Sequence, residues 1–273
     1  SSDKGTSPLE IKGGQSLEGI QYQMPMGSAQ VKSCLLLAGL YANGTTEISE
    51  PAVTRDHTER MLRGFGYAVK TEGNVVSLRG GGKLEAMSID VPADISSAAF
   101  FLVAASITPN SDITLEHVGV NRTRTGVIDI LLKMGADIQL QNERTVGGEK
   151  VADIRVRSSQ LNGIDVPENL VALAIDEFPV IFIAAAYAKG KTRVTGAEEL
   201  RVKESDRIQA MADGLQRLGV DAQATIDGMI INGGPVYGGE VESVDDHRIA
   251  MAFAVAGLQA EGVIKINNCE NVG

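Results

Sequence analysis

The sequence predicts a mixed α/β (α+β) protein built from repeated β-α-β-α-β-β units. Three observations carry this prediction: an apolar helix followed by a strand recurs four times, an amphipathic helix follows the first three copies, and alternating residues around glycine-containing turns come next. Because each copy keeps the same order of elements, the chain is best explained as an array of one supersecondary unit.

The recurring first helix begins at a small or acidic polar residue, is rich in alanine, and ends near Gly or Asn before a strand of Thr, Ile and Val. The four copies start at Ser28, Ser96, Asp176 and Asp246. Charges are absent around most of each helix, so we expect the helices to be buried with sheets packed around them. Cys34, inside the first of them, is expected to be a core residue.

The second helix of each unit is amphipathic, and we expect its charged face to meet water. A glycine ends each of these helices and alternating residues follow, which are the usual signals of a helix C-cap and a strand. Hairpins are predicted at residues 72–74 and 227–228, where glycine lies between alternating runs. The three helices start at Arg55, Asn121 and Arg201 and end at Gly66, Gly135 and Gly219.

The repeats predict a division of the chain near residue 89. Residues 1–89 hold one unit, whereas residues 90–273 hold two full units and the start of a third. The chain does not begin with Met and stops directly after a strand-like run, so we expect it to be a fragment of a longer protein.

Composition narrows the classes of function. With 25 Lys and Arg against 35 Asp and Glu, the net charge is −10, and no basic stripe is present, which argues against nucleic acid as a partner. The three histidines are scattered and no zinc motif accompanies them, so no metal site is expected. Only two cysteines occur, which favours a reducing compartment without a disulfide framework. The longest apolar runs, near 180–188 and 249–258, are shorter than the ~20 residues that span a membrane. We therefore expect a cytoplasmic protein.

Helix openings concentrate unpaired backbone N–H groups, so several openings aimed at one crevice would bind anions. Taken singly, Ser28, Ser96 and Asp176 are explained as ordinary N-caps. Long polar side chains beside these openings, at Gln30 and Lys32 and at His247 and Arg248, are harder to explain in that way.

The densest charged cluster is the segment 201–207, with three cations and two carboxylates directly before an amphipathic helix. A solvated helix start is the simple explanation, but three cations oppose the helix dipole and so favour an anionic ligand. A carboxylate beside Lys203 is a candidate proton donor or acceptor, and Asp176 is the natural second carboxylate.

Five segments carry a family resemblance. Residues 28–40 (SAQVKSCLLLAGL), 54–62 (TRDHTERML), 175–180 (IDEFPV), 201–207 (RVKESDR) and 246–251 (DHRIAM) resemble 5-enolpyruvylshikimate-3-phosphate (EPSP) synthases, also called 3-phosphoshikimate 1-carboxyvinyltransferases. They are most similar to the bacterial class with SAQVKS. The five motifs stand in the order in which the family has them and span nearly the whole chain.

The resemblance implies transfer of the enolpyruvyl group of phosphoenolpyruvate to the 5-hydroxyl of shikimate 3-phosphate, with release of phosphate, on the pathway to chorismate and aromatic amino acids. It also implies a cytoplasmic, monomeric glyphosate target that uses no metal or organic cofactor. The family fold is an inside-out α/β barrel of two domains, each of three units, that close over the substrates. Residues 1–89 would form part of the upper domain and 90–273 most of the lower one, with further substrate-binding motifs before Ser1 and after Gly273.

The resemblance also assigns residues to roles. Asp176 would accept the proton of the reacting hydroxyl, Glu204 would donate a proton to the methylene carbon, and Lys203 would contact substrate and tune charge. Ala29 would lack the side-chain contact that Ser makes in other members. Shikimate 3-phosphate would be bound by Ser28, Ala29, Gln30, Arg55, Asp176 and Lys203, and phosphoenolpyruvate by Gln30, Arg207 and Arg248.

Two alternatives stay open. The sister enolpyruvyl transferase acts on UDP-N-acetylglucosamine, but segment 201–207 disfavours it, and Cys34 lies in an apolar helix rather than in a reactive loop. The chain as given could also be an inactive partial scaffold that binds shikimate 3-phosphate weakly.

Overall fold

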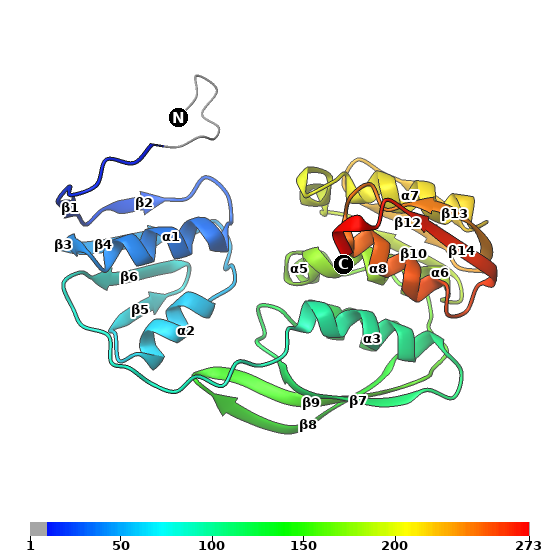
Figure 1. Cartoon of the computed structure of the whole chain (residues 1–273), viewed down its shortest axis with the longest axis horizontal. Coiled ribbons are helices and arrows are strands. Elements are labelled where there is room, and N and C mark those ends of the chain that lie inside the picture. Colours follow the sequence, from blue (N-terminus) through cyan, green and yellow to red (C-terminus); the bar gives the residue numbers. More distant parts are fainter. Residues whose placement is uncertain (1–9, 273) are drawn as a thin grey trace. The chain divides into compact units, whose positions relative to one another are not determined.

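The computed structural model describes residues 10–272, apart from the side chain of Asn271, and forms two compact units divided between Ile89 and Asp90. In Figure 1 unit 1 runs from blue to cyan and unit 2 from green to red. Both units are mixed α/β structures, so the predicted fold class is confirmed.

Unit 1 contains one β-α-β-α-β-β repeat. Its main sheet has the order β2-β4-β6-β5, in which β2 and β4 are parallel and the other pairs antiparallel, and β1 and β3 form a separate short parallel pair. The predicted hairpin at 72–74 joins β5 to β6. The elements are β1 (Leu17–Glu18), β2 (Gln21–Gln23), α1 (Ala29–Gly39), β3 (Ala42–Asn43), β4 (Thr45–Ser49), α2 (His57–Gly64), β5 (Val69–Glu72) and β6 (Val75–Arg79).

Helix α1 begins where the sequence indicates, because the Ser28 hydroxyl accepts a hydrogen bond from the backbone N–H of Val31 at 3.3 Å. The expectation that α1 is wholly buried is wrong. Only Lys32, Leu36 and Gly39 of α1 are buried, and Cys34 is exposed rather than a core residue. The physical reason is that its contacts within unit 1, to β4, β6, β1 and α2, lie on the side that carries Lys32, Leu36 and Gly39, so the residues on the other side stay exposed.

Unit 2 repeats the same order of elements. Its sheets are β7-β9-β8, β10-β12-β11 and the parallel pair β13-β14. The first strand of each full repeat is reduced to isolated parallel bridges, Ala93 with Val118 and Asp165 with Arg193.

Unit 2 begins with α3 (Ile95–Ile107), β7 (Asp112–Gly119), α4 (Gly126–Lys133), β8 (Asp137–Val146), β9 (Glu149–Arg157) and α5 (Glu168–Val171). A 3-10 segment (Ala172–Glu177), α6 (Phe178–Ala186), β10 (Lys191–Val194), a second 3-10 segment (Glu198–Val202), α7 (Arg207–Arg217), β11 (Asp221–Ala224) and β12 (Met229–Asn232) follow. The last elements are β13 (Tyr237–Glu242), α8 (His247–Ala256), β14 (Glu261–Asn267) and a 3-10 turn (Glu270–Val272).

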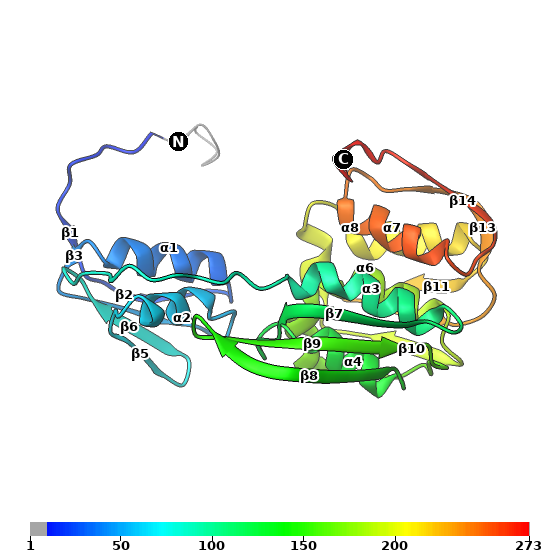
Figure 2. The same cartoon turned by 60° about the horizontal axis from the view of Figure 1, so that its bottom comes forward.

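The three apolar helices α3, α6 and α8 pack on one another and form the core of unit 2, as the sequence predicts. Every residue of α6 is buried. The sheets cover these helices from outside, with α3 lying along the β7-β9-β8 sheet (Figures 1 and 2). Because α6 and α8 both begin at acidic residues, their packing brings charged side chains to one end of the core.

One stretch is longer than the sequence analysis expects. The helical run Glu168–Ala186 has 19 residues and is apolar enough by length and composition to cross a membrane. It joins α5, a 3-10 segment with non-helical backbone at Ala174, and α6. Since 78% of its apolar window is buried inside unit 2, it has the character of a core helix.

Candidate active site

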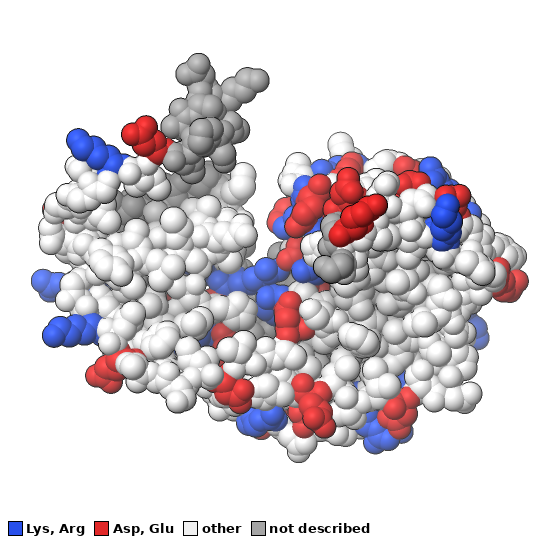
Figure 3. Space-filling view, in the orientation of Figure 1, with Lys and Arg blue, Asp and Glu red and all other residues white. Residues whose placement is uncertain are grey.

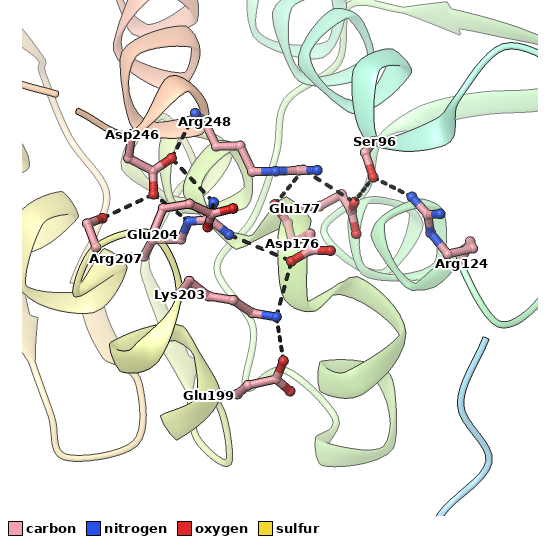
Figure 4. A network of polar contacts seen from close by, with 11 residues as sticks. Ser96, Arg124, Asp176, Glu177, Glu199, Lys203, Glu204, Arg207, Asp246 and Arg248 are labelled. Carbon is pink, nitrogen blue, oxygen red and sulfur yellow. Dashed lines mark hydrogen bonds and ion pairs between the residues drawn. The ribbon is translucent and has the colours of Figure 1, made fainter. Parts of the chain in front are cut away.

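The buried guanidinium of Arg207 is the centre of a polar network in unit 2 (Figure 4). Arg207 begins α7, and its side chain is only 1% exposed. Its Nε donates to Asp246 Oδ2 at 2.7 Å, and its Nη2 donates to Asp246 Oδ1 at 3.3 Å and to Glu204 Oε2 at 2.6 Å. The two contacts to Asp246 fix the plane of the guanidinium, as fork-shaped pairing does.

Asp246 is fully buried and links three segments. Besides Arg207, its carboxylate accepts from the backbone N–H of Arg248 at 2.9 Å, which caps α8, and from the Ser205 hydroxyl at 3.1 Å. Burial raises the pKa of the Asp246 carboxyl, but the hydrogen bonds and charge of Arg207, with those two donors, outweigh it and leave the pKa below its ordinary value. Sequence reasoning identified Asp246 only as a helix opening and missed this anchoring role.

Asp176 and Lys203 lie on the other side of the same guanidinium. Asp176 Oδ1 is 3.6 Å from Arg207 Nη1 and 3.5 Å from Lys203 Nζ, and the Lys203 ammonium also pairs with Glu199. Asp176 is not an N-cap: it lies in the 3-10 segment, and Glu177 precedes α6 without a side-chain capping bond. The alternative that Asp176 is merely a cap is therefore wrong.

Arg248 reaches the same place from the start of α8. Its Nη1 donates to the backbone carbonyl of Asp176 at 2.9 Å and lies 3.8 Å from Glu177 Oε1. Its side chain is 18% exposed, whereas the side chain of Glu204 is 55% exposed. The structure thus brings together five of the sequence-predicted residues, Asp176, Lys203, Glu204, Arg207 and Arg248.

Sequence reasoning missed a second layer of this network. The Ser96 hydroxyl donates to Glu177 Oε1 at 2.5 Å and accepts from Arg124 Nη2 at 2.5 Å. Ser96 is therefore not the cap of α3, a role that Asp94 fills by accepting from the Ser96 backbone N–H. The sequence does hold a signal for this layer: two arginines in the segment 121–124 lie just before α4, much as cations precede α7.

Glu177 is buried among these groups. Burial raises the pKa of the Glu177 carboxyl, and the Ser96 hydrogen bond and the charges of Arg124 and Arg248 offset this only in part, so the pKa stays above its ordinary value. The folded protein therefore binds a proton here more readily than the unfolded chain does.

We predict that Glu177→Gln raises the free energy of unfolding at pH 7 to 8, because it removes a carboxylate whose ionisation opposes folding. The gain should shrink as the pH falls through the raised pKa of the folded state, because protonation then relieves the same cost in the wild type. Urea unfolding across this range measures the effect, with exposed Glu116→Gln as the control. A Glu177→Gln protein that is less stable than the wild type at every pH would contradict the prediction.

The other sequence-predicted residues belong to unit 1. Ser28 and Ala29 begin α1, Gln30 is exposed one position later, and Arg55 lies half-buried in the segment between β4 and α2. A Cβ at Gly27 would lie 3.2 Å from Cγ2 of Thr54, so the segments that carry Ser28 and Arg55 are neighbours.

Charge on the surface is mixed in sign. On the face of unit 2 seen in Figure 3, acidic and basic side chains are both present. Within residues 10–272, no group of three or more His, Cys, Asp or Glu side chains is arranged to hold a metal ion.

Known proteins of one kind are similar to this chain in sequence and in fold. A 3-phosphoshikimate 1-carboxyvinyltransferase of Methylococcus capsulatus is 64% identical over 270 residues, which are 99% of this chain and 62% of that protein. One of Alkalilimnicola ehrlichii is 66% identical over 98% of this chain and 60% of its own length. A solved EPSP synthase of Acinetobacter baumannii superposes with a TM-score of 0.93 at 60% identity, covering the whole chain and 63% of that structure.

The chain thus spans about 62% of the length of the curated relatives it matches. These names do not favour the UDP-N-acetylglucosamine alternative, and they confirm the resemblance inferred from the five motifs. The pattern that defines the family described as EPSP synthase (3-phosphoshikimate 1-carboxyvinyltransferase) matches residues 1–273. The chain therefore belongs to the EPSP synthase family.

Proposed function

We propose that the full-length protein containing this chain transfers the enolpyruvyl group of phosphoenolpyruvate to the 5-hydroxyl of shikimate 3-phosphate and releases phosphate. The observation that carries the proposal is the convergence of Asp176, Lys203, Glu204, Arg207 and Arg248 at one end of the unit 2 core. Two guanidinium groups and one ammonium group suit anionic substrates, and two carboxylates beside them suit proton transfer.

The reaction needs one addition and one elimination. In the addition, the hydroxyl oxygen bonds to the central carbon of phosphoenolpyruvate, its proton passes to Asp176, and Glu204 gives a proton to the methylene carbon. In the elimination, the Glu204 carboxylate takes a proton back from the resulting methyl group, the bond between the central carbon and the phosphate oxygen breaks, and the departing phosphate takes the proton held by Asp176, which restores the double bond. Glu204 suits the donor role because it is half exposed, so substrate can reach it, while Arg207 holds one of its oxygens.

The two arginines would hold the carboxylate of phosphoenolpyruvate. Arg207 is preorganised to bind a carboxylate, because its Nε is held by Asp246 and its Nη1 therefore points toward Asp176. Arg248 is more accessible and would supply the second guanidinium. Lys203, between Glu199 and Asp176, would hold the hydroxyl substrate near the proton acceptor.

Shikimate 3-phosphate would also contact Ser28, the backbone at Ala29, Gln30 and Arg55 in unit 1, and Gln30 would reach phosphoenolpyruvate as well. In this proposal unit 1 is part of the upper domain and unit 2 most of the lower domain. The enzyme would be a cytoplasmic monomer that needs no metal or organic cofactor.

Phosphate release by the full-length protein tests the proposal. We expect release only when shikimate 3-phosphate and phosphoenolpyruvate are both present, and a rate at least about 10²-fold lower for Asp176→Asn, which removes the proton acceptor. Release with UDP-N-acetylglucosamine in place of shikimate 3-phosphate, or no release with either acceptor, would overturn it.

A further inference from the structure

Lys32 is a buried cation in α1, a helix in which only Leu36 and Gly39 are buried besides it. Its side chain is 1% exposed, and its ammonium Nζ lies 2.9 Å from Glu50 Oε1 and 2.8 Å from Glu59 Oε1, whose side chains are each 2% exposed. Glu50 follows β4 and Glu59 lies in α2, so one ammonium joins three segments of unit 1. The mechanism proposed above does not use any of these three groups.

The Lys32 contacts close a ring that includes one proposed substrate-binding residue, Ser28, and lies next to another, Arg55. The second oxygen of Glu50 accepts a hydrogen bond from the Thr54 hydroxyl. Thr54 in turn packs against Gly27, where a Cβ would lie 3.2 Å from its methyl group. Gly27 precedes Ser28, whose carbonyl accepts from the backbone N–H of Lys32 at 3.0 Å. Ser28 is part of this ring, and Arg55 is the next residue in the chain after Thr54.

The Lys32 cluster is not an arrangement that stability alone favours. One ammonium faces two buried carboxyl groups, and within the described residues Glu59 Oε2 is buried without a hydrogen-bond partner. Buried ion pairs are often no better for stability than apolar residues of the same volume, and an unpaired buried oxygen lowers it. What the cluster does supply is a fixed distance between the start of α1 and the segment that carries Arg55.

We propose that Lys32 is a positioning residue: through Glu50 and Thr54 it holds residues 51–56 against the start of α1, and so fixes Arg55 relative to Ser28 for shikimate 3-phosphate. The inference rests on the proposed function, which gives Ser28 and Arg55 that ligand. It adds residues that touch no substrate, namely Lys32, Glu50, Thr54 and Glu59.

Thr54→Val in the full-length enzyme is the most conservative test, because it removes one hydroxyl and leaves both ion pairs of Lys32 in place. We expect the KM for shikimate 3-phosphate to rise about fivefold or more, as the loss of one hydrogen bond of about 1 kcal/mol predicts. The KM for phosphoenolpyruvate should stay within about twofold of the wild type, because the variant weakens only the binding of shikimate 3-phosphate. The matched control is Ser33→Ala, which removes the 2.7 Å contact between Ser33 and Thr58 and so loosens α1 from α2 without touching Glu50 or Thr54.

Two further variants separate positioning from stability. Lys32→Met leaves two buried carboxyl groups without their cation, so its melting temperature should fall. Its KM for shikimate 3-phosphate should rise as in Thr54→Val. The variant Lys32→Met/Glu50→Gln/Glu59→Gln removes the uncompensated charge, so it should recover most of the lost melting temperature but still have a raised KM for shikimate 3-phosphate. A recovered melting temperature together with a wild-type KM, or an equal rise of both KM values, would overturn the inference.

Amide hydrogen exchange distinguishes a failure of this inference from a failure of the proposed function, because it needs no substrate. Residues 51–56 should exchange faster in Thr54→Val than in the wild type and remain unchanged in Ser33→Ala. Faster exchange in an enzyme that never uses shikimate 3-phosphate would uphold the structural tie and overturn the proposed function. Unchanged exchange and unchanged KM in an active enzyme would overturn the role of Lys32.

Discussion

Replacing Asp246 by alanine is expected to lower the free energy of unfolding by about 3 to 5 kcal/mol, the range found when one partner of a buried ion pair is removed. Arg207, which is only 1% exposed, would keep its charge and lose the two hydrogen bonds that its Nε and Nη2 donate to Asp246. Helix α8 would also lose its N-cap, because Asp246 accepts from the Arg248 N–H. Urea unfolding of the full-length protein at pH 7 measures the loss.

Asp206→Ala is the matched control for this prediction. Asp206 also caps a helix, accepting from the Gln209 N–H at 3.0 Å, and also pairs with an arginine, Arg201, but its side chain is 40% exposed. We expect a loss of only about 1 kcal/mol there, as for an ordinary N-cap. Equal losses in the two variants would show that burial of the Asp246 pair has no special effect.

The pH dependence of the Asp246 effect has a definite sign. The pKa of this carboxyl is lower in the folded protein than in the unfolded chain, so its contribution is complete above the unfolded value of about 4. It is lost as the pH falls through the lower folded value. The difference between the wild type and Asp246→Ala should therefore be constant from pH 6 to 8 and shrink only below about pH 4.

Glu204→Gln is expected to slow turnover by about 10²-fold or more, as for the loss of a positioned acid or base. The amide oxygen of glutamine can still accept from Arg207 Nη2, so the KM values should change little while kcat falls. Phosphate release by the full-length enzyme measures both quantities. Exposed Glu198→Gln, six positions earlier, is the control and should keep wild-type turnover; wild-type turnover in Glu204→Gln would remove this carboxylate from the mechanism.

The repeated architecture was predictable because its signals are local. Alanine-rich helices, a glycine after each amphipathic helix and alternating strands recur within each unit, and the structure has α1, α3, α6 and α8 as the sequence analysis expects. The hairpins were predictable for the same reason, since a glycine between two alternating runs specifies a turn.

What the sequence could not indicate depends on pairing between distant residues. The burial of Arg207 requires Asp246, which is 39 positions away, and the burial of Lys32 requires Glu50 and Glu59 on other elements. Periodicity alone places such cations on solvated faces. Cys34 illustrates the reverse case, because an apolar pattern predicts burial only where a second surface covers the helix.

The candidate site was predictable in its members but not in its connections. Asp176, Lys203, Glu204, Arg207 and Arg248 followed from motifs and from cations at helix openings. Asp246 as an anchor, and the layer formed by Ser96, Arg124 and Glu177, became visible only when the helix openings were placed side by side. Residues that hold other residues in place carry no local signal of their own.

A crystal structure of the full-length protein with shikimate 3-phosphate and phosphoenolpyruvate bound tests the central claim most directly. We predict that the phosphoenolpyruvate carboxylate contacts Arg248 and Arg207, that the 5-hydroxyl lies beside Asp176, and that Glu204 faces the methylene carbon. Both ligands bound at a place that none of these four side chains reaches would contradict the account.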